Sequence, residues 1–436
     1  MNRRDALKLV AAGAAGLGLN ETALAFPFGS TKKRELTASE DAFLEDLTQA
    51  GCRYFWEEAS DKTGQVRDRA MAQIPSSHGK ESRRVSSVAA TGFGLTALCI
   101  ADWRGYLPRN DIRLRVLHTL QYHWEQMPQE HGFFYHYNDM ETGTRAFKCE
   151  LSSIDTCIFL CGALMAREYF KNTSGLGPQI AELATKIYDR VDFPWMLNKE
   201  TQFSMGWTPE FGFLAVRWQH YCELMMLVLL AIGSNTHPID GVYWQYFRRP
   251  IASYSGIRYI SGPDPLFTHQ FSHAWFDFRN LRDKFANYFD NSISATRAHR
   301  AFCLSMKQWY NDDYWGVSAS DSQRGYQAWG GPPALGHIDG SVVPCATAGS
   351  VAFLPQECLR VLMSLRERYG KDAWGRYGFT DALRPSARWY NDDVLGIDQG
   401  ISVLMAENLR TEMIWATFMQ ADEIRLAITK SGLHTQ

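Results

Sequence analysis

The stretch TASEDAFLEDLTQAGCRYFWEE, residues 37–58, shows the pattern that most of the chain repeats. Thr37 is followed three residues later by Glu40, a pair that can form a capping box at the start of a helix. The apolar residues then recur at helical spacing, at Phe43, Leu44, Leu47, Tyr54 and Phe55. The stretch therefore predicts an amphipathic helix.

Amphipathic patterns of the same period follow along the chain. They lie at about 86–104, 110–127, 152–171, 178–191, 213–232, 271–289, 294–310, 347–369 and 397–428. Pairs of these predicted helices recur at roughly 50 to 70 residues, as expected if helical hairpins close into a ring. The prediction is an all-α fold, a single (α/α)6 toroid whose long loops form a cleft.

Composition narrows the range of partners. The chain has 436 residues, of which 45% are hydrophobic and 21% charged, and its net charge of −2 offers no attraction for nucleic acid or anionic membranes. It contains 14 Trp, 19 Tyr and 25 Phe residues, which suits a cleft that stacks flat ligands such as sugars. The alternative is that these aromatic residues only fill a large helical core.

The N-terminus is typical of an export signal. Arg3 and Arg4 precede an apolar run over residues 6–19, and Ala25 ends a predicted cleavage site. The paired arginines favour a twin-arginine signal and a periplasmic location. The apolar run is too short to span a bilayer. We therefore predict a signal peptide over 1–25, a linker over 26–38 and one catalytic domain over 39–430.

Nine cysteines are scattered along the chain, at positions 52, 99, 149, 157, 161, 222, 303, 345 and 358. Most have apolar neighbours within helical patterns, which is typical of small core residues. One disulfide remains open for an exported chain, but no spacing defines a disulfide framework or a zinc knuckle.

Five long connectors carry the candidate functional residues, since long loops in a compact domain are usually functional. In the first connector, Asp139 and Glu141 form either a polar cluster that faces a ligand beside Tyr135 or a turn. Glu150 fits both interpretations. Asp155 falls in the first turn of a predicted helix, where an acid complements the helix dipole, so we interpret it as structural.

The second connector places Glu210 among aromatic residues, including Trp207. Desolvation there would raise the pKa of the carboxyl group and suit a general acid. The alternative is an acid at a helix N-terminus, whose pKa backbone donors would lower.

In the third connector, His269 and His273 lie four residues apart and could share one helix face. A hydrolytic metal site would need a third ligand, and the neighbouring Glu of a zincin motif is absent. We favour a hydrogen-bonding or sugar-contacting pair beside Trp275 and predict no metal and no cofactor.

The fourth connector interleaves aromatic residues and glycines with hydroxyl groups. Trp329 would offer a stacking surface, and Asp321 and Asp339 are possible ligand contacts. The alternative interpretation, tight turns at a barrel rim, explains the glycines but not the tryptophans.

The fifth connector ends at Asp398, beside glycines at a predicted helix entry. Helix amides could hold this carboxylate ionised, so that it acts as a base toward water. The alternative is a simple helix cap.

Taken in order, many segments of the chain resemble the glycoamylase-like family, glycoside hydrolase family 144. They include SVAATGFGLTAL, GFFYHYND, ELSSIDT, MGWTPEFGF, GSNTHPI, PLFTHQFSHAWFDFR, WGVSASD, WGGPP, DGSVVPCATAGS, YGFTDA and GIDQGISVLMAEN. The resemblance runs from about residue 40 to 428. It implies a single (α/α)6 barrel that hydrolyses β-1,2-glucan to sophorose or short sophorooligosaccharides with inversion.

Carried over to matching positions, the resemblance implies Glu210 as the acid and Asp398 as the base. It implies that Asp139, Glu141 and Glu150 are neighbouring subsite carboxylates. The candidate substrate contacts are Asp139, Glu141, Glu150, Tyr135, Trp207, His269, His273, Trp275, Trp329 and Asp321.

Three other functions stay open on sequence alone: exo-hydrolysis of another glucan such as starch, periplasmic glucan binding without catalysis, and polysaccharide lysis. The expected partner is a glucan oligosaccharide or polysaccharide, with no nucleic acid and no stable membrane insertion, and we expect a monomer. Endo and exo action stay equally open.

Overall fold

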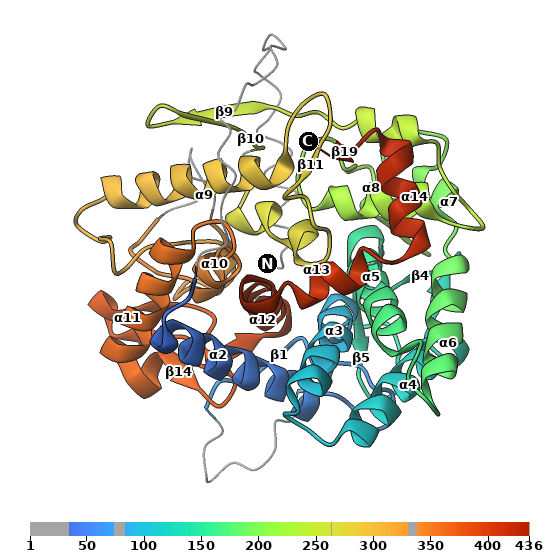
Figure 1. Ribbon diagram of the computed structural model, residues 1–436, viewed down its shortest axis with the longest axis horizontal. Helices are drawn as coiled ribbons and strands as arrows, with labels where there is room; N and C mark the ends of the chain where they lie inside the picture. Colours follow the sequence, from blue (N-terminus) through green and yellow to red (C-terminus); the bar gives the residue numbers. More distant parts are fainter. Residues whose placement is uncertain (1–34, 74–82, 263, 330–337, 436) are drawn as a thin grey trace.

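The computed structural model describes residues 35–73, 83–262, 264–329 and 338–435 (Figure 1). The predicted signal peptide and most of the linker lie outside these residues. The α-helices are α2 (Ala38–Glu57), α3 (Val88–Arg104), α4 (Arg109–Glu125), α5 (Ser153–Phe170), α6 (Gly177–Asp189), α7 (Phe193–Leu197), α8 (Leu224–Gly233), α9 (Tyr288–Ser305), α10 (Pro344–Ala348), α11 (Pro355–Ala373), α12 (Gly396–Thr411), α13 (Met413–Phe418) and α14 (Asp422–Ser431). The prediction of a helix-rich fold is confirmed.

Short antiparallel strands occupy the connectors, a feature that the all-α prediction missed. They are β1 (Arg69–Met71), β2 (Val85–Ser87), β3 (Gln129–Glu130), β4 (Phe133–Phe134), β5 (Tyr137–Asp139), β6 (Leu151–Ser152), β7 (Gly206–Thr208), β8 (Gly212–Phe213), β9 (Ile251–Tyr254), β10 (Ile257–Ile260), β11 (Leu281–Arg282), β12 (Ala319–Ser320), β13 (Gln327–Ala328), β14 (Trp374–Gly375), β15 (Gly378–Phe379), β16 (Leu383–Arg384), β17 (Trp389–Tyr390), β18 (Asp393–Leu395) and β19 (His434–Thr435). At two to four residues each, these strands are too short to show alternation in the sequence.

The helices form a central group and a surrounding group. In Figure 1, α12, α3 and α5 lie near the centre of the view, and α2, α4, α6, α9 and α11 lie at its periphery. Helix α3 packs against both α5 and α12, and α2 covers α12 from outside. Because α3 and α5 are buried along almost their whole length, their sequences are apolar or small on every side.

Helix α2 begins as its sequence predicts. The side chain of Thr37 accepts a hydrogen bond from the backbone N–H of Glu40, and the Glu40 carboxylate accepts one from the backbone N–H of Thr37. The predicted capping box is therefore confirmed. The apolar stripe is buried as expected.

Two glycines let α3 and α5 approach at backbone distance. A Cβ atom added at Gly92 would overlap the carbonyl oxygen of Ile158, and one added at Gly162 would overlap the carbonyl oxygen of Gly92. No flexible side chain can yield at this crossing, because the opposing atoms belong to the backbone. The crossing fixes the distance between the two helices.

Strand pairs join the starts of the central helices at one end of the molecule. Strand β18 continues directly into α12, β2 into α3, and β6 into α5. Strand β18 pairs with β1, β2 pairs with β5, and β6 pairs with β7. Bridges between Arg67 and Ser86 and between Tyr135 and Leu151 connect these pairs into one series. The N-termini of three central helices are thereby held together.

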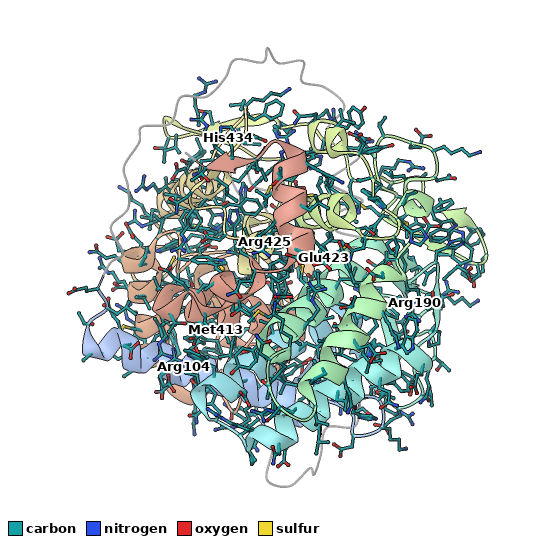
Figure 2. All side chains as sticks on the ribbon, turned by 45° about the vertical axis from the view of Figure 1, so that its right-hand side comes forward. Arg104, Arg190, Met413, Glu423, Arg425 and His434 are labelled. Carbon is teal, nitrogen blue, oxygen red and sulfur yellow. The ribbon has the colours of Figure 1, made fainter. Side chains whose placement is uncertain are left out.

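Ion pairs attach the C-terminal helices to the centre. Glu423, at the start of α14 (Figure 2), accepts hydrogen bonds from both terminal nitrogens of Arg167 in α5, at 2.8 and 2.6 Å. Arg104 at the end of α3 donates to the fully buried Glu407 of α12 at 2.9 Å. Among the described residues, no helix is both long and apolar enough to cross a membrane.

Four predicted helices differ from the structure. Residues 213–223 form β8 and a loop, so that helix α8 starts only at Leu224. The patterns at 347–369 and 397–428 are each divided, into α10 and α11 and into α12, α13 and α14. The prediction for 271–289 is wrong. That segment contains the short 3₁₀ turn η3 (Phe271–Ala274) and strand β11.

The next helix, α9, begins later than 271 because the side chain of Asn287 caps it, accepting hydrogen bonds from the N–H groups of Phe289 and Asp290. Three other 3₁₀ turns are η1 (Gly241–Gln245), η2 (Leu266–His269) and η4 (Pro385–Ala387). All nine cysteines lie within the described residues and are buried, and none of them forms a disulfide there, which confirms their interpretation as core residues.

His269 and His273 lie on η2 and η3 inside the core. Of the two interpretations that the sequence left open, hydrogen bonding is confirmed and contact with a sugar is wrong. They are 2% and 0% exposed. Their Nε2 atoms lie 3.1 Å from the hydroxyl of Ser261 and 3.0 Å from that of Ser292. Burial lowers the pKa of each imidazole to about 3, so both rings are neutral at physiological pH.

These histidines make the fold sensitive to acid. In the unfolded chain they take up protons below about pH 6.5, but in the folded chain they do so only near pH 3, so stability falls as the pH decreases through that window. Each contributes a slope of up to about 1.4 kcal/mol per pH unit. Replacement His273→Gln is expected to flatten the fall in unfolding free energy between pH 6.5 and 4, measured by denaturant titration. The control is His237→Gln, which replaces an exposed histidine. If the unfolding free energy falls equally steeply with decreasing pH in the wild type and in both variants, burial of His273 is not the cause of the acid sensitivity.

The glycine crossing gives a second prediction. Gly92→Ala places a methyl group against backbone and is expected to destabilise the fold by about 1–3 kcal/mol or more. Gly94→Ala in the same helix is the matched control, since its methyl group would meet side-chain atoms of Val66 and Phe55 at 3.0 and 3.1 Å. Thermal unfolding should show the larger loss for Gly92→Ala, and a larger loss for Gly94→Ala would exclude the backbone contact as the cause.

Candidate functional site

Carboxyl groups gather where the strand series meets the central helices. Asp393 lies on β18, Asp398 in the first turn of α12 and Asp139 on β5. Glu210 lies in the turn between β7 and β8, at the other end of the same series. Sequence-distant acids are therefore brought to one end of the molecule.

Asp398 lines a small pocket at the start of α12. The other lining residues include Asp381, Cys345, Gln399 and Phe379. The carboxyl groups of Asp398 and Asp381 lie close enough in this pocket for the charge of Asp398 to raise the pKa of Asp381, and the same charge raises the pKa of the neighbouring Cys345 thiol. Both aspartates are buried, at 7% and 3% exposure.

The two carboxyl groups cannot both be ionised at low cost. Burial, followed by the charge of Asp398, raises the pKa of Asp381 well above its ordinary value. The pair therefore holds a proton at pH values at which isolated carboxyl groups would have lost theirs. Such a pair can both accept and donate protons.

A second group of acids surrounds Arg69 of β1. Its guanidinium donates to Asp321 at 2.8 Å and lies 3.5 Å from Asp68 and 3.6 Å from Asp393. Arg83 also donates to Asp393 at 2.7 Å. Burial raises the pKa of Asp68, although the charge of Arg69 opposes this. The predicted contact residue Asp321 thus lies in this network, next to the Asp381–Asp398 pair.

Asp139 stabilises a turn, one of the two interpretations that the sequence left open. Its carboxylate accepts hydrogen bonds from the N–H groups of Glu141 and Thr142 at 3.0 Å each and from Arg84 at 2.8 Å. Burial opposes its ionisation, but these donors outweigh that effect and lower its pKa. Glu141 lies beside it and contacts Lys62 at 3.2 Å.

Glu150 and Asp155 both approach His136. The imidazole Nδ1 lies 3.1 Å from Glu150 and 3.6 Å from Asp155. Ser152 caps α5 by accepting from the N–H of Asp155 at 3.1 Å, as the sequence predicts, and its hydroxyl donates to the carboxylate of Asp155. Glu150 stays a candidate contact.

Glu210 differs from its sequence prediction. Its side chain is 41% exposed and accepts two hydrogen bonds from Arg145, at 2.7 and 3.0 Å. These bonds lower its pKa, so of the two interpretations that the sequence left open the desolvated carboxyl with a raised pKa is wrong for the free protein. The pKa is lowered, as the alternative predicted, but the largest cause is Arg145 and not the backbone donors of a helix. The guanidinium of Arg145 also lies 5.0 Å from the ring centre of Tyr135. The cause is a basic partner 65 residues away, which local sequence cannot show.

The predicted aromatic contacts divide into two groups. Trp275 is fully buried and donates to Thr96 at 2.9 Å, and Trp329 is 3% exposed and donates to Ser320 at 3.1 Å. Neither ring presents a face to a ligand, so both predictions are wrong. Trp207, on β7 and half-buried, stays a candidate, and Phe211 in the following turn is 89% exposed.

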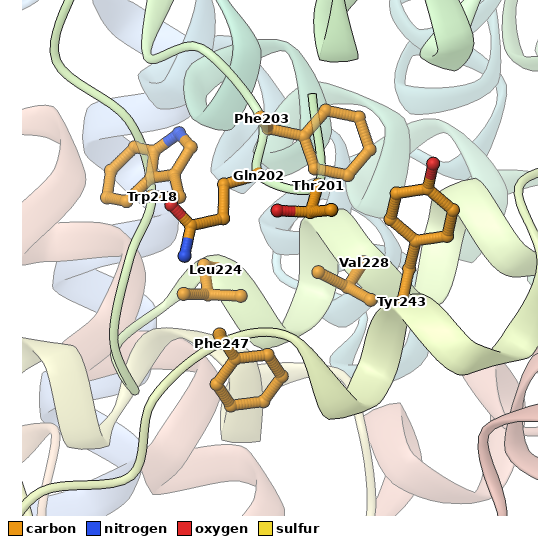
Figure 3. A pocket seen from close by; sticks show the side chains of 8 residues that line it. All are labelled: Thr201, Gln202, Phe203, Trp218, Leu224, Val228, Tyr243 and Phe247. Carbon is orange, nitrogen blue, oxygen red and sulfur yellow. The ribbon is translucent and has the colours of Figure 1, made fainter. Parts of the chain in front are cut away.

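Another pocket lacks acid–base groups. It lies between residues 201–203 and the segment that contains α8 and η1 (Figure 3). Its lining is Thr201, Gln202, Phe203, Trp218, Leu224, Val228, Tyr243 and Phe247. Because this lining has no carboxyl or imidazole group, the pocket at Asp398 is the better candidate for proton-transfer chemistry.

Several residues at the site were absent from the sequence predictions, among them Asp381, Arg69 and Arg145. The motif YGFTDA contains Asp381, but nothing in its spacing points to Asp398. Within the part of the chain that the structure describes, no cluster of three or more His, Cys, Asp or Glu side chains is arranged to hold a metal ion.

The Arg145 contact yields a direct prediction. Replacement Arg145→Met removes both donors and is expected to raise the pKa of Glu210 toward its ordinary value, as measured by carbon-13 NMR titration of the glutamate carboxyl groups. Arg84→Met, which removes a partner of Asp139, is the control. An unchanged Glu210 titration in Arg145→Met would show that the ion pair does not exist in solution.

Comparisons with other proteins bear on the family. A family model described as "Putative glucoamylase" matches residues 215–422. A curated protein of Parabacteroides distasonis, an exo β-1,2-glucooligosaccharide sophorohydrolase (non-reducing end), is 25% identical over 432 residues, covering 90% of this chain. The chain spans 58% of the length of that relative.

Solved structures share the fold. A putative glucoamylase from Bacteroides caccae matches with a TM-score of 0.85 and 26% identity, covering 91% of this chain and all of the other. An endo-β-1,2-glucanase from Chitinophaga pinensis, in complex with sophorotriose and glucose, matches with a TM-score of 0.84 and 24% identity, covering 92% of this chain and 99% of the other. The resemblance predicted from the motifs is therefore confirmed: the chain is similar in sequence and in fold to glycoamylase-like proteins.

Proposed function

We propose that the chain is a glycoside hydrolase that cleaves β-1,2-glucan to sophorose or short sophorooligosaccharides. The observation that carries this proposal is the pocket at the start of α12, lined by the buried carboxyl groups of Asp398 and Asp381, at the end of the molecule where the strand series also carries Glu210. Hydrolysis of a glycosidic bond needs one carboxyl group that accepts a proton and one that donates it. The names of the similar proteins supply the substrate class.

We propose further that the helices close into an (α/α)6 barrel. Support comes from the inner contacts of α3 with α5 and α12 and of α5 with α8. Outer helices α2, α6 and α14 cover α12, α5 and α8 respectively, as paired layers of such a barrel would. The carboxyl groups would then lie at the end of the barrel where the inner helices begin.

In the proposed inverting reaction, ionised Asp398 takes a proton from water as the water oxygen bonds to the anomeric carbon. The bond from that carbon to the glycosidic oxygen breaks, and Glu210 gives its proton to the departing oxygen. Solvent then removes the proton from Asp398 and restores the one on Glu210. No step requires a metal or cofactor.

Glu210 must change state for this role. In the free protein its two hydrogen bonds from Arg145 favour the ionised carboxylate. We propose that a bound sugar separates this ion pair and covers the carboxyl group, so that desolvation raises its pKa. The neighbouring Tyr135, Trp207 and Glu150 would contact the same substrate.

Location and assembly are also proposals. The twin-arginine pattern at Arg3 and Arg4 supports export to the periplasm. We propose a monomer that acts on a glucan without stable membrane insertion, and the small net charge of −2 favours a partner other than nucleic acid.

Substitution of the two proposed catalytic residues tests the function. With linear β-1,2-glucan as substrate, we expect Glu210→Gln and Asp398→Asn each to lower kcat by about a hundredfold to ten-thousandfold, with unchanged thermal unfolding midpoints. Glu182→Gln, a surface carboxyl on α6 that pairs with Lys186, is the control. Full activity of Glu210→Gln would place the acid elsewhere, and hydrolysis of starch but not of β-1,2-glucan would replace the proposed substrate.

A further inference from the structure

Asp381 is held in place by hydrogen bonds on one side only. Its Oδ2 atom accepts from the backbone N–H of Asp321 at 2.7 Å and from the side-chain amide of Asn391 at 3.2 Å. Its own backbone N–H donates to the carbonyl oxygen of Asp393 at 2.9 Å. The carboxyl group is therefore fixed relative to β18, the strand that leads into α12.

The other oxygen, Oδ1, is buried and has no hydrogen-bond partner among the described residues, and an oxygen of Asp398 in the same pocket is likewise buried. Two neighbouring carboxyl groups can hydrogen-bond to each other only when one of them holds a proton, because both are otherwise acceptors. A neutral carboxyl group has one carbonyl oxygen, which accepts, and one hydroxyl, which donates. The surroundings of Asp381 match this division, with Oδ2 as the acceptor and Oδ1 as the oxygen that holds the proton.

The surroundings of Asp398 favour its charged form. It lies in the first turn of α12, where the helix dipole stabilises negative charge. The Cys345 thiol, a weak donor, lines the same pocket beside it. Asp381 lies outside any helix and has the charge of Asp321 as a further neighbour, which disfavours a second negative charge there.

We propose that Asp381 is a positioning residue that keeps its proton and donates it from Oδ1 to Asp398, which holds Asp398 ionised and oriented as the base. This inference rests on the proposed function and deepens it. The charged or titratable groups that face Asp381 are Asp398 of α12, Asp321 after β12, Cys345 of α10 and Arg69 of β1. Of these, only Arg69 carries positive charge, and its hydrogen bond goes to Asp321.

Two substitutions separate the proton from the negative charge. In Asp381→Asn, the amide oxygen can accept from Asp321 and Asn391 while the NH₂ group donates to Asp398, as the neutral acid does. We expect the acid limb of its pH profile for kcat/KM to stay where it is in the wild type. Asp381→Ala donates nothing, and its acid limb should move upward by about one pH unit, because the charged form of Asp398 loses a hydrogen bond.

Infrared spectroscopy gives a readout that needs no substrate. At pH 6 the wild type should show the carbonyl stretch of a protonated buried carboxyl group, and Asp381→Asn should lack that band. The matched control is Asp283→Asn, which alters another buried aspartate, one that accepts from Trp244 and Tyr288 at 2.8 Å each. This control should lose stability but keep both the band and the acid limb.

An acid limb that moves equally in Asp381→Asn and Asp381→Ala, or in neither, would overturn the proposal, as would absence of the band from the wild type. If Asp381→Ala does not fold, the pH profile of Asp381→Asn and the infrared band still test whether Asp381 holds a proton. The proposed function can also fail separately. If the wild type shows the band, Asp381→Asn lacks it, and the wild type does not cut β-1,2-glucan, then the proposed function is refuted while the protonation of Asp381 is supported.

Discussion

The antiparallel pairing of short strands just before the central helices is the constraint on which the rest of the structure depends. Strands β18, β2 and β6 pass without a loop into α12, α3 and α5, so pairing the strands also aligns the helix starts. The backbone crossing at Gly92 and Gly162 fixes how closely two of these helices pack. Strand pairing and helix packing together leave little freedom for the residues at the junctions.

This arrangement explains why acidic side chains can be concentrated at one end of the protein. Helix N-termini stabilise negative charge, and Arg69 lies among Asp68, Asp321 and Asp393. Asp381 and Asp398 lie beyond the ion pairs of that arginine and are buried, so they share a proton instead. Aspartates beside Arg69 and aspartates in the neighbouring pocket therefore differ in their protonation states.

The sequence predicted those features that depend on local pattern. The period of apolar residues located α2, α3, α5 and α6 well, and Thr37 with Glu40 located a helix start. Features that depend on distant partners were missed. Arg145 lowers the pKa of Glu210 from 65 positions away, and the spacing of His269 and His273 suggested a helix face where the chain forms two 3₁₀ turns in an apolar core. Asp398 was predicted from its helix entry, but its partner Asp381 has no local signal.

The carboxyl groups at these helix starts are proposed to hydrolyse β-1,2-glucan with inversion. The most direct test is proton NMR of residues 26–436 during the first turnovers on linear β-1,2-glucan, which reports the anomeric form of each new reducing end before mutarotation. Because inversion at a β-linkage gives an α-product, we expect short sophorooligosaccharides that are released as the α-anomer. Release of the β-anomer would contradict the inverting roles of Asp398 and Glu210, and the absence of any product would contradict the hydrolase itself.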